Sequence, residues 1–261
     1  MTSTREALRW RMLGLGLVAG VVAGGLGVGG GIVLVPLLLW VGLDRHSAHA
    51  TSLAAILPIA IAGAISFGLS GEADFGIGVT VGIGGIVGSA IGATVMHRSS
   101  PRALTVIFDI VLLVAAVRMV MGGDPMVGTV GLESPGQIGV ALLIGAVAGF
   151  FAGLSGVGGG VVIVPATVLL LGLTQHAAQG TSLVAIIFTA VSATLVNLRN
   201  KRVLLRDGLV VGAGGVVGSL LGSQIALRTE GRTLSLVFGL LALFVVGQSL
   251  FRTLRPKPIG P

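Results

Sequence analysis

The sequence contains no cysteine and no tyrosine, and only 10% of its 261 residues are charged. Without cysteine, disulfides and thiolate metal sites are excluded. Soluble domains carry about 25% charged residues, so this chain lacks the polar surface that a water-soluble fold needs. The sequence also shows no nucleophile–base pair and no metal-ligand cluster. We therefore expect neither an enzyme nor a bound metal or cofactor.

Hydrophobic residues make up 54% of the chain, and its mean hydropathy is +1.06. The sequence divides into apolar stretches of membrane-spanning length, separated by short polar joints. Small residues let helices approach closely in lipid and tolerate breaks in a helix, which explains the 45 glycines. These features predict an all-α polytopic membrane protein with the lipid bilayer as its surroundings.

The net charge of +7 does not indicate binding to nucleic acid. Lys and Arg gather at the ends of the hydrophobic segments, where they set the orientation of membrane helices. The first cluster, Arg5 to Arg11 before an apolar run, resembles a secretory signal peptide. No small-residue cleavage site precedes polar sequence, so we expect this segment to be retained.

The sequence is duplicated. Residues 18–36 align without a gap to residues 147–165, and thirteen of the nineteen positions are identical. After one inserted residue the match resumes, pairing His46 with His176, Thr51 with Thr181, Ser52 with Ser182, and Gly88 with Gly218. A match of this length and spacing indicates two copies of one half.

Each copy holds four apolar segments, at residues 13–41, 47–68, 76–97 and 102–121, and then at 137–172, 177–197, 208–227 and 232–251. A stretch rich in Pro, Gly and acidic residues lies between the copies. We predict a first transmembrane repeat at 1–121, a linker at 122–136 and a second transmembrane repeat at 137–261.

A glycine-rich break in the first segment of each copy leaves two topologies open. A segment that crosses the membrane once gives parallel repeats of four transmembrane helices. A segment that dips in and returns gives inverted repeats, each with a re-entrant helical hairpin and three transmembrane helices. With a cytoplasmic N-terminus, the hairpin topology places thirteen Lys and Arg inside and two outside, against ten and five for the alternative. The positive-inside rule therefore favours inverted repeats, with both termini in the cytoplasm.

The returning half of each hairpin would begin near the midplane, because its arms of ten to thirteen residues span about 15–20 Å. Free N–H groups and the positive end of the helix dipole would face the tip. Two such tips would form an anion site made of backbone. The predicted ligands are Gly27, Gly29, Gly30 and Gly31, with Gly156, Gly158, Gly159 and Gly160. In the alternative interpretation these glycines only pack helices; Pro36 and Pro165 are assigned a structural role.

Two hydroxyls stand near the start of the next span in each copy, Thr51 and Ser52 in the first and Thr181 and Ser182 in the second. They are candidates to donate to an oxyanion, or else they bond to carbonyls of their own helix. His46 and His176 are candidates for proton relay or anion binding, or else for caps at the membrane interface.

Asp109 is the one acid placed well inside an apolar segment, and its counterpart is Gly239. Acids at such positions often serve ion or proton coupling. The alternative is that Asp109 pairs with a neighbouring hydroxyl.

The paired motifs carry a resemblance. Gly27–Gly31 followed by hydrophobic residues and Pro36, then His46, Thr51 and Ser52, all repeated in the second copy, resemble the sulfite exporter TauE/SafE family of membrane permeases. The resemblance covers nearly the whole chain. It implies a secondary transporter of the bacterial inner membrane for small sulfur-containing or organic anions, such as sulfite, sulfoacetate or related sulfonates, with proton coupling.

Our hypothesis is therefore alternating access around a midplane anion site. Two rivals stay open: a passive anion channel, and a metal-ion permease that uses His46, His49 and His176. The oligomeric state is not predicted.

Overall fold

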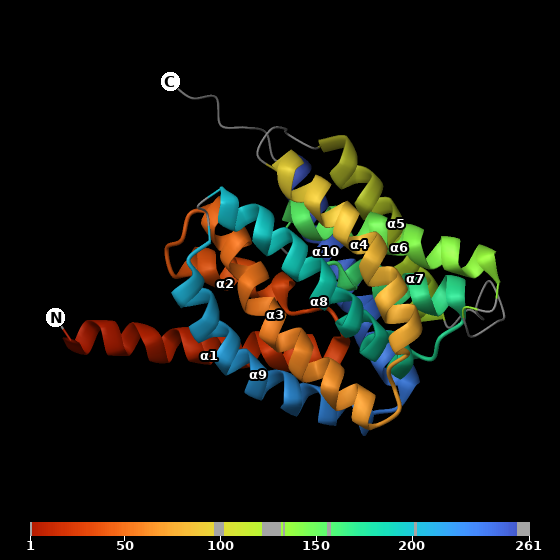
Figure 1. Cartoon of the computed structure of the whole chain (residues 1–261), viewed down its shortest axis with the longest axis horizontal. Coiled ribbons are helices and arrows are strands. Elements are labelled where there is room, and N and C mark those ends of the chain that lie inside the picture. Colours follow the sequence, from red (N-terminus) through yellow and green to blue (C-terminus); the bar gives the residue numbers. More distant parts are fainter. Residues whose placement is uncertain are drawn as a thin grey trace.

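The computed structural model describes residues 2–96, 102–121, 132, 134–155, 158–200 and 203–254. Within these ranges the chain forms ten α-helices and no strand (Figure 1). The helices are α1 (Thr2–Leu26), α2 (Gly31–Trp40), α3 (Arg45–Leu69), α4 (Phe75–Met96), α5 (Arg102–Met121), α6 (Pro135–Ser155), α7 (Gly160–Leu171), α8 (Gln175–Arg199), α9 (Leu205–Leu227) and α10 (Gly231–Leu254).

The predicted apolar segments are confirmed as helices. Six of them are long and apolar enough to cross a membrane: α3, α4, α6, α8, α9 and α10. The two segments with a glycine run are each divided, the first into α1 and α2 and the second into α6 and α7. The protein is therefore an all-helical, multi-span membrane protein.

One length prediction was wrong. The outgoing helices α2 and α7 have 10 and 12 residues, as expected for helices that reach about half the membrane. The incoming helices α1 and α6 have 25 and 21 residues, well beyond the expected ten to thirteen. Helix α1 gains its extra length by continuing through the charged start of the chain.

Glycines spaced four residues apart hold α1 against α9. A Cβ added to Gly16, Gly20 or Gly24 of α1 would overlap a backbone carbonyl of α9, and one added to Gly214, Gly218 or Gly222 of α9 would overlap a carbonyl of α1. The two backbones therefore touch directly, and small residues at this spacing permit such an approach.

The same arrangement recurs between α4 and α6. Gly84, Gly88 and Gly92 of α4 face carbonyls of α6, while Gly145, Gly149 and Gly153 of α6 face carbonyls of α4. We call these two interfaces the glycine seams. Each seam joins a helix from one half of the sequence to a helix from the other half, so the two halves interlock.

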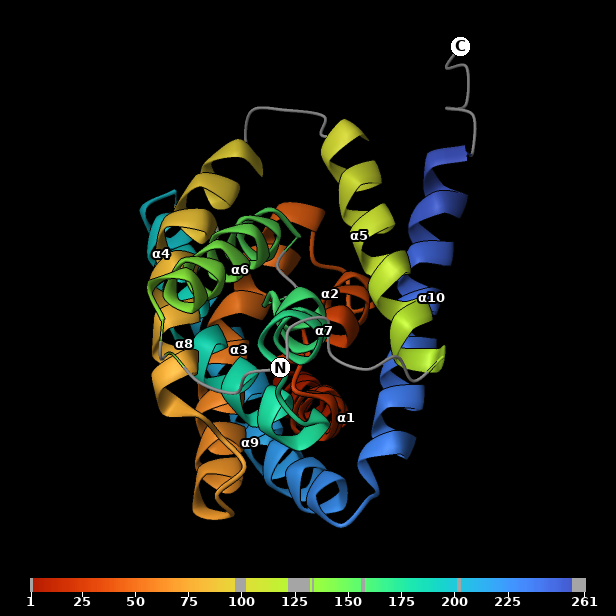
Figure 2. The same ribbon diagram turned by 90° about the vertical axis from the view of Figure 1, so that its right-hand side faces the viewer.

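The central helices α3 and α8 pack against each other, and each also packs against a seam helix of the other half, α9 or α4. The short helices occupy the interior: α2 packs on α3, and α7 packs on α8 on one side and α5 on the other (Figure 2). Helices α5 and α10 stand side by side at the edge of the bundle.

Large apolar side chains are exposed along the outer faces of α3, α4, α5, α9 and α10, including Ile65, Ile91, Val114, Leu221 and Phe244. A soluble protein rarely exposes so much contiguous apolar surface. These faces are suited to contact with lipid tails.

Candidate functional site

The first glycine run reverses the direction of the chain. Gly27, Gly29 and Gly30 have φ of 70°, 75° and 77°, a region that side-chain-bearing residues rarely adopt. A Cβ on Gly30 would lie 2.8 Å from the carbonyl oxygen of Ala19 and 3.2 Å from the Cβ of Ala23. Because Gly30 lies beside the last turns of α1, α2 folds back along α1.

The second glycine run makes the same reversal. Gly158 and Gly159 have φ of 94° and 82°. A Cβ on Gly159 would lie 2.9 Å from the carbonyl oxygen of Ala148 and 3.3 Å from the Cβ of Ala152, so α7 folds back along α6. Gly156 lies outside the described residues. We call Gly27–Gly31 and Gly158–Gly160 the two tips.

The two tips touch each other. A Cβ on Gly160 would lie 2.5 Å from the carbonyl oxygen of Gly27 and 2.6 Å from the Cα of Val28. A Cβ on Gly158 would lie 3.5 Å from the carbonyl oxygen of Val28. All residues of both tips are buried. The glycines predicted as ligands are thus brought together inside the bundle, apart from Gly156.

The tips lie at the middle of the long helices. A Cβ on Gly29 would lie 3.3 Å from side-chain atoms of both Ile56 and Ile186. Each isoleucine is the twelfth residue of a 25-residue helix, Ile56 in α3 and Ile186 in α8. Since α3 and α8 have the length of full membrane spans, this contact places the tips near half depth.

Each outgoing helix begins with free donors at a tip. The residues Gly30 and Gly159 are left-handed N-caps without a side-chain hydrogen bond. In α2, the first N–H groups that donate a hydrogen bond are those of Val33 and Leu34, and both donate to the Gly30 carbonyl. Among the described residues, the N–H groups of Gly31 and Ile32 have no backbone acceptor.

Serine and threonine side chains hold the tips in place. The Ser182 hydroxyl donates to the Gly27 carbonyl at 2.8 Å, across the two halves, and the Thr189 hydroxyl lies 3.4 Å from the Gly158 carbonyl. Ser52 donates to the His49 carbonyl of its own helix at 2.8 Å. Ser182 therefore lies beside the first tip, and its proton is directed at the backbone of that tip.

Thr51 and Thr181 have matching roles at the two ends of the bundle. The Thr51 oxygen accepts from the Leu204 N–H at 3.1 Å, and the Thr181 oxygen accepts from the Asp74 N–H at 3.0 Å. These N–H groups precede α9 and α4. Each threonine thus fixes the start of a seam helix of the other half, an arrangement that neither sequence alternative anticipated.

The two predicted histidines lie at helix ends. His46 is exposed in the first turn of α3, and its N–H donates to the Asp44 carboxylate at 3.1 Å. His176 is half-buried, and its Nε2 lies 3.1 Å from the Ala226 carbonyl and 2.9 Å from the Thr229 carbonyl. Since both partners are acceptors, this nitrogen carries the proton and caps the end of α9.

Asp44 is the N-cap of α3, where its carboxylate accepts from the N–H groups of His46 and Ser47. Hydrogen bonds from the side chain and then the backbone of Ser47 hold the pKa of this exposed carboxyl below its ordinary value of 3.8.

Replacing Asp44 by alanine is expected to lower the melting temperature in detergent at pH 7, whereas asparagine, an equally good cap, is expected to preserve it. Because the folded pKa is depressed, the stabilisation is complete above the ordinary carboxyl pKa and disappears as pH falls through the folded value. Thermal unfolding between pH 7 and pH 3 checks this: the gap between wild type and Asp44→Ala should narrow as the pH falls below 3.8. A gap that is independent of pH would contradict it.

Asp109 lies on α5, with 9% of its surface exposed, in the helix that packs against α10 and α7.

Pro36 and Pro165 lie inside α2 and α7. Pro165 is buried and Pro36 is exposed.

Sequence reasoning missed Ile56, Ile186 and Gln179 at the tips. A Cβ on Gly27 would lie 2.6 Å from the Cα of Gln179 and 2.9 Å from its Cβ. The available signal was a glutamine in an apolar segment, one turn before Ser182 and therefore on the same helix face.

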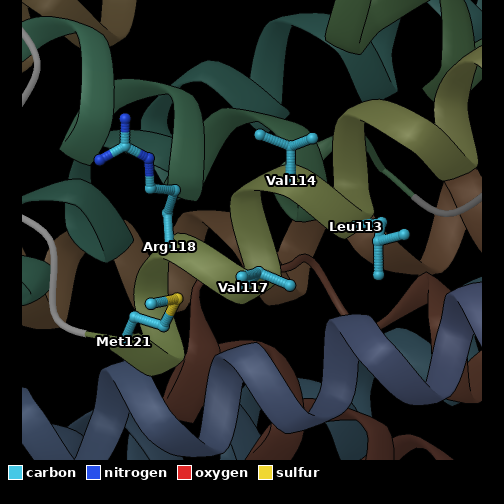
Figure 3. A pocket seen from close by; sticks show the side chains of 5 residues that line it. All are labelled: Leu113, Val114, Val117, Arg118 and Met121. Carbon is cyan, nitrogen blue, oxygen red and sulfur yellow. The ribbon is translucent and has the colours of Figure 1, made fainter.

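Two hollows lie away from the contact between the tips. One, of about 620 Å³, lies on the outer face of α5 and is lined by Leu113, Val114, Val117, Arg118 and Met121 (Figure 3). The other, of about 600 Å³, follows α6 and α7 and is lined by residues from Ser134 to Val147 and from Val162 to Leu171. Both linings are mainly apolar, as expected for surfaces that face lipid.

The helix content and the buried, paired helix breaks define a polytopic membrane protein of transporter type. The sequence profile described as "Sulfite exporter TauE/SafE" matches residues 2–120 and 141–260. The chain therefore belongs to the TauE/SafE family of membrane transporters, and it is not an enzyme.

Curated bacterial relatives agree. The chain is 24% identical over 266 residues to the "Probable membrane transporter protein YunE" of Bacillus subtilis (strain 168), covering 91% of this chain and 95% of the relative. It is 29% identical over 250 residues to a "Probable membrane transporter protein" of Xylella fastidiosa (strain Temecula1 / ATCC 700964), covering 92% and 94%. No solved structure matches.

Proposed function

We propose that the protein is a secondary transporter that moves a small sulfur-containing or organic anion, such as sulfite, sulfoacetate or a related sulfonate, across the bacterial inner membrane. The observation that carries the proposal is the contact between two buried glycine tips, each at the N-terminus of a short helix. Two positive dipole ends and their free N–H groups converge there.

The backbone supplies the binding groups in this mechanism. N–H groups of the tip glycines hold the anion, and no Lys or Arg is present in either tip. Binding by neutral donors is weak enough to be reversible, which transport requires. The Ser182–Gly27 hydrogen bond fixes the first tip to α8, while Thr51 and Thr181 fix the starts of the seam helices α9 and α4.

We also propose inverted repeats, 1–121 and 137–261 joined by a linker at 122–136, with both termini in the cytoplasm. The chain reversal at each glycine run supports this topology, because a reversed segment contributes no net crossing. Trp10 at one end of the first hairpin and Trp40 at the other are 74% and 81% exposed. Tryptophan favours the membrane interface, so both ends of this hairpin are suited to the same side.

Alternating access requires that the tips be reached from one side at a time. The tips contact Ile56 and Ile186, and in the proposed cycle this arrangement corresponds to an occluded state. Proton coupling is part of the proposal, with Asp109, His46 and His176 as the titratable candidates.

Transport by purified protein in liposomes tests the proposal. Labelled sulfite, sulfoacetate, sulfate and thiosulfate are offered separately, with and without a pH gradient. We expect one or more of these anions to accumulate above its equilibrium distribution when the gradient is present. Equilibration without accumulation under any gradient would identify a passive channel, and no uptake of any of the four would remove the proposed substrate class.

A further inference from the structure

Gln179 carries a buried amide without a partner. The residue lies in the second turn of α8 and is completely buried. Within the part of the chain that the structure describes, neither its Nε2 nor its Oε1 has a hydrogen-bond partner. Burying an amide in this way is costly unless another molecule satisfies it. The site is therefore built to receive a polar guest.

The amide stands beside the first tip. The backbone of Gln179 contacts Gly27, and Ser182, three residues further along the same face of α8, donates to the Gly27 carbonyl. A guest bound at the tips would be within reach of the Gln179 side chain, which has two donors on Nε2.

The polar face of α8 continues from Gln179 toward the N-terminal end of the helix. Gln175, Gln179, Ser182 and Ile186 are spaced by four, three and four residues, so they lie on one face. The face runs from the first residue of α8 to its middle, about 16 Å at 1.5 Å per residue. Gln175 is 6% exposed, and its Oε1 accepts from the Ser235 hydroxyl at 3.2 Å. Its Nε2 has no partner among the described residues.

We propose that Gln179 is a direct ligand of the transported anion and that Gln175 lines the route by which the anion reaches the tips. This rests on the proposed function and extends it, because it adds a neutral side-chain donor to a backbone site. The equivalent position in the first copy is His49, which is half-buried on the matching face of α3.

Cysteine accessibility tests the route without knowledge of the substrate, because the chain has no native cysteine. Gln179→Cys and Gln175→Cys are treated in proteoliposomes with a membrane-impermeant methanethiosulfonate that carries a sulfonate group. Val184→Cys is the matched control, since Val184 is 4% exposed and lies on the opposite face of α8, where it packs against Gly78 of α4.

We expect both glutamine positions to react at least tenfold faster than the control. A transported anion that does not react with the thiosulfonate, such as sulfoacetate or sulfate, is expected to slow the reaction at Gln179. Equal rates at Gln179 and at the control would overturn the route.

Transport kinetics test the ligand role. For an anion that the wild type carries, Gln179→Leu is expected to raise KM about tenfold or more, the loss typical of one hydrogen bond to a charged group. Gln179→Glu is expected to abolish transport, because a carboxylate repels the anion. Leucine removes an unsatisfied amide, so the melting temperature should not fall. An unchanged KM, or a lower melting temperature with only the maximal rate reduced, would show a structural role and overturn the proposal.

A failure of the proposed function can be distinguished from a failure of the proposed role of Gln179. If the wild type carries none of the four anions, the proposed substrate class fails, while the labelling rates still decide whether Gln179 lines an aqueous route. If the wild type carries an anion and the variants match it in KM and labelling, only the role of Gln179 fails.

Discussion

Replacing Gly218 by alanine is expected to destabilise the protein by about 3 kcal/mol or more, at or beyond the upper end of the range for overpacked cores. The added methyl group would overlap the Leu17 carbonyl of α1. Backbone atoms cannot rotate away as a side chain can, so α1 and α9 would have to separate along the whole seam. Thermal unfolding in detergent, followed by size-exclusion chromatography, measures the loss. Gly88→Ala is expected to have the same effect, because its methyl group would overlap the Ala146 carbonyl of α6.

Gly14 of α1 is the matched control, because a Cβ there has no neighbour within 4 Å. Alanine favours a helix over glycine by up to about 1 kcal/mol, so Gly14→Ala is expected to keep or raise the melting temperature. If Gly14→Ala raises the melting temperature and Gly218→Ala lowers it, the loss comes from contact across the seam and not from helix propensity. Equal melting temperatures for Gly14→Ala and Gly218→Ala would contradict the seam.

Hydropathy and the internal repeat predicted most of the helical architecture. The apolar segment at residues 47–68 became α3, and the glycine run at 27–31 became a break, because both depend on local properties. An apolar stretch of that length forms a helix in lipid, and consecutive glycines weaken a helix wherever they occur. The meeting of the tips was predicted from the duplication, because an inverted arrangement of the two copies would place equivalent features opposite each other.

Partner choice could not be predicted in this way. The spacing of Gly214, Gly218 and Gly222 shows that α9 has a face for close packing, but not that α1 covers it. The same limit applies to Thr51, whose acceptor role depends on the Leu204 N–H, 153 residues away in sequence. Such contacts depend on how the halves interlock, and the composition of each helix does not contain that information.

The length of the incoming helices shows a further limit. The estimate for α1 stopped where its apolar residues stop, near Leu13, yet the helix continues back to Thr2. Polar residues at a membrane surface can also be helical. Their side chains form hydrogen bonds with water, while their backbone groups form hydrogen bonds within the helix. Hydropathy therefore indicates where a helix enters the membrane, but not where the helix begins.

Substitutions at the tips are expected to have a large effect on transport. Gly29→Leu and Gly158→Leu are expected to reduce transport to the background of empty liposomes while the protein still inserts. Gly29 has φ of 75°, and a Cβ there would already lie 3.3 Å from Ile56 and Ile186. A leucine side chain would be larger still, and in the proposed mechanism it would displace the anion from the tip N–H groups. Uptake of the transported anion, normalised to inserted protein, measures the effect.

The control for backbone strain is Gly71→Leu, because Gly71 has φ of 74° but no atom within 4 Å of an added Cβ. Left-handed backbone costs a residue with a side chain about 1–2 kcal/mol, and this cost is shared by both variants. Only Gly29→Leu also blocks the tips, so Gly71→Leu is expected to insert and transport like the wild type. Gly29→Ala, with a single methyl group, should fold and retain partial transport. Wild-type rates for both Gly29→Leu and Gly158→Leu would refute an anion site made of tip backbone, because a bound anion could not coexist with a leucine at either tip.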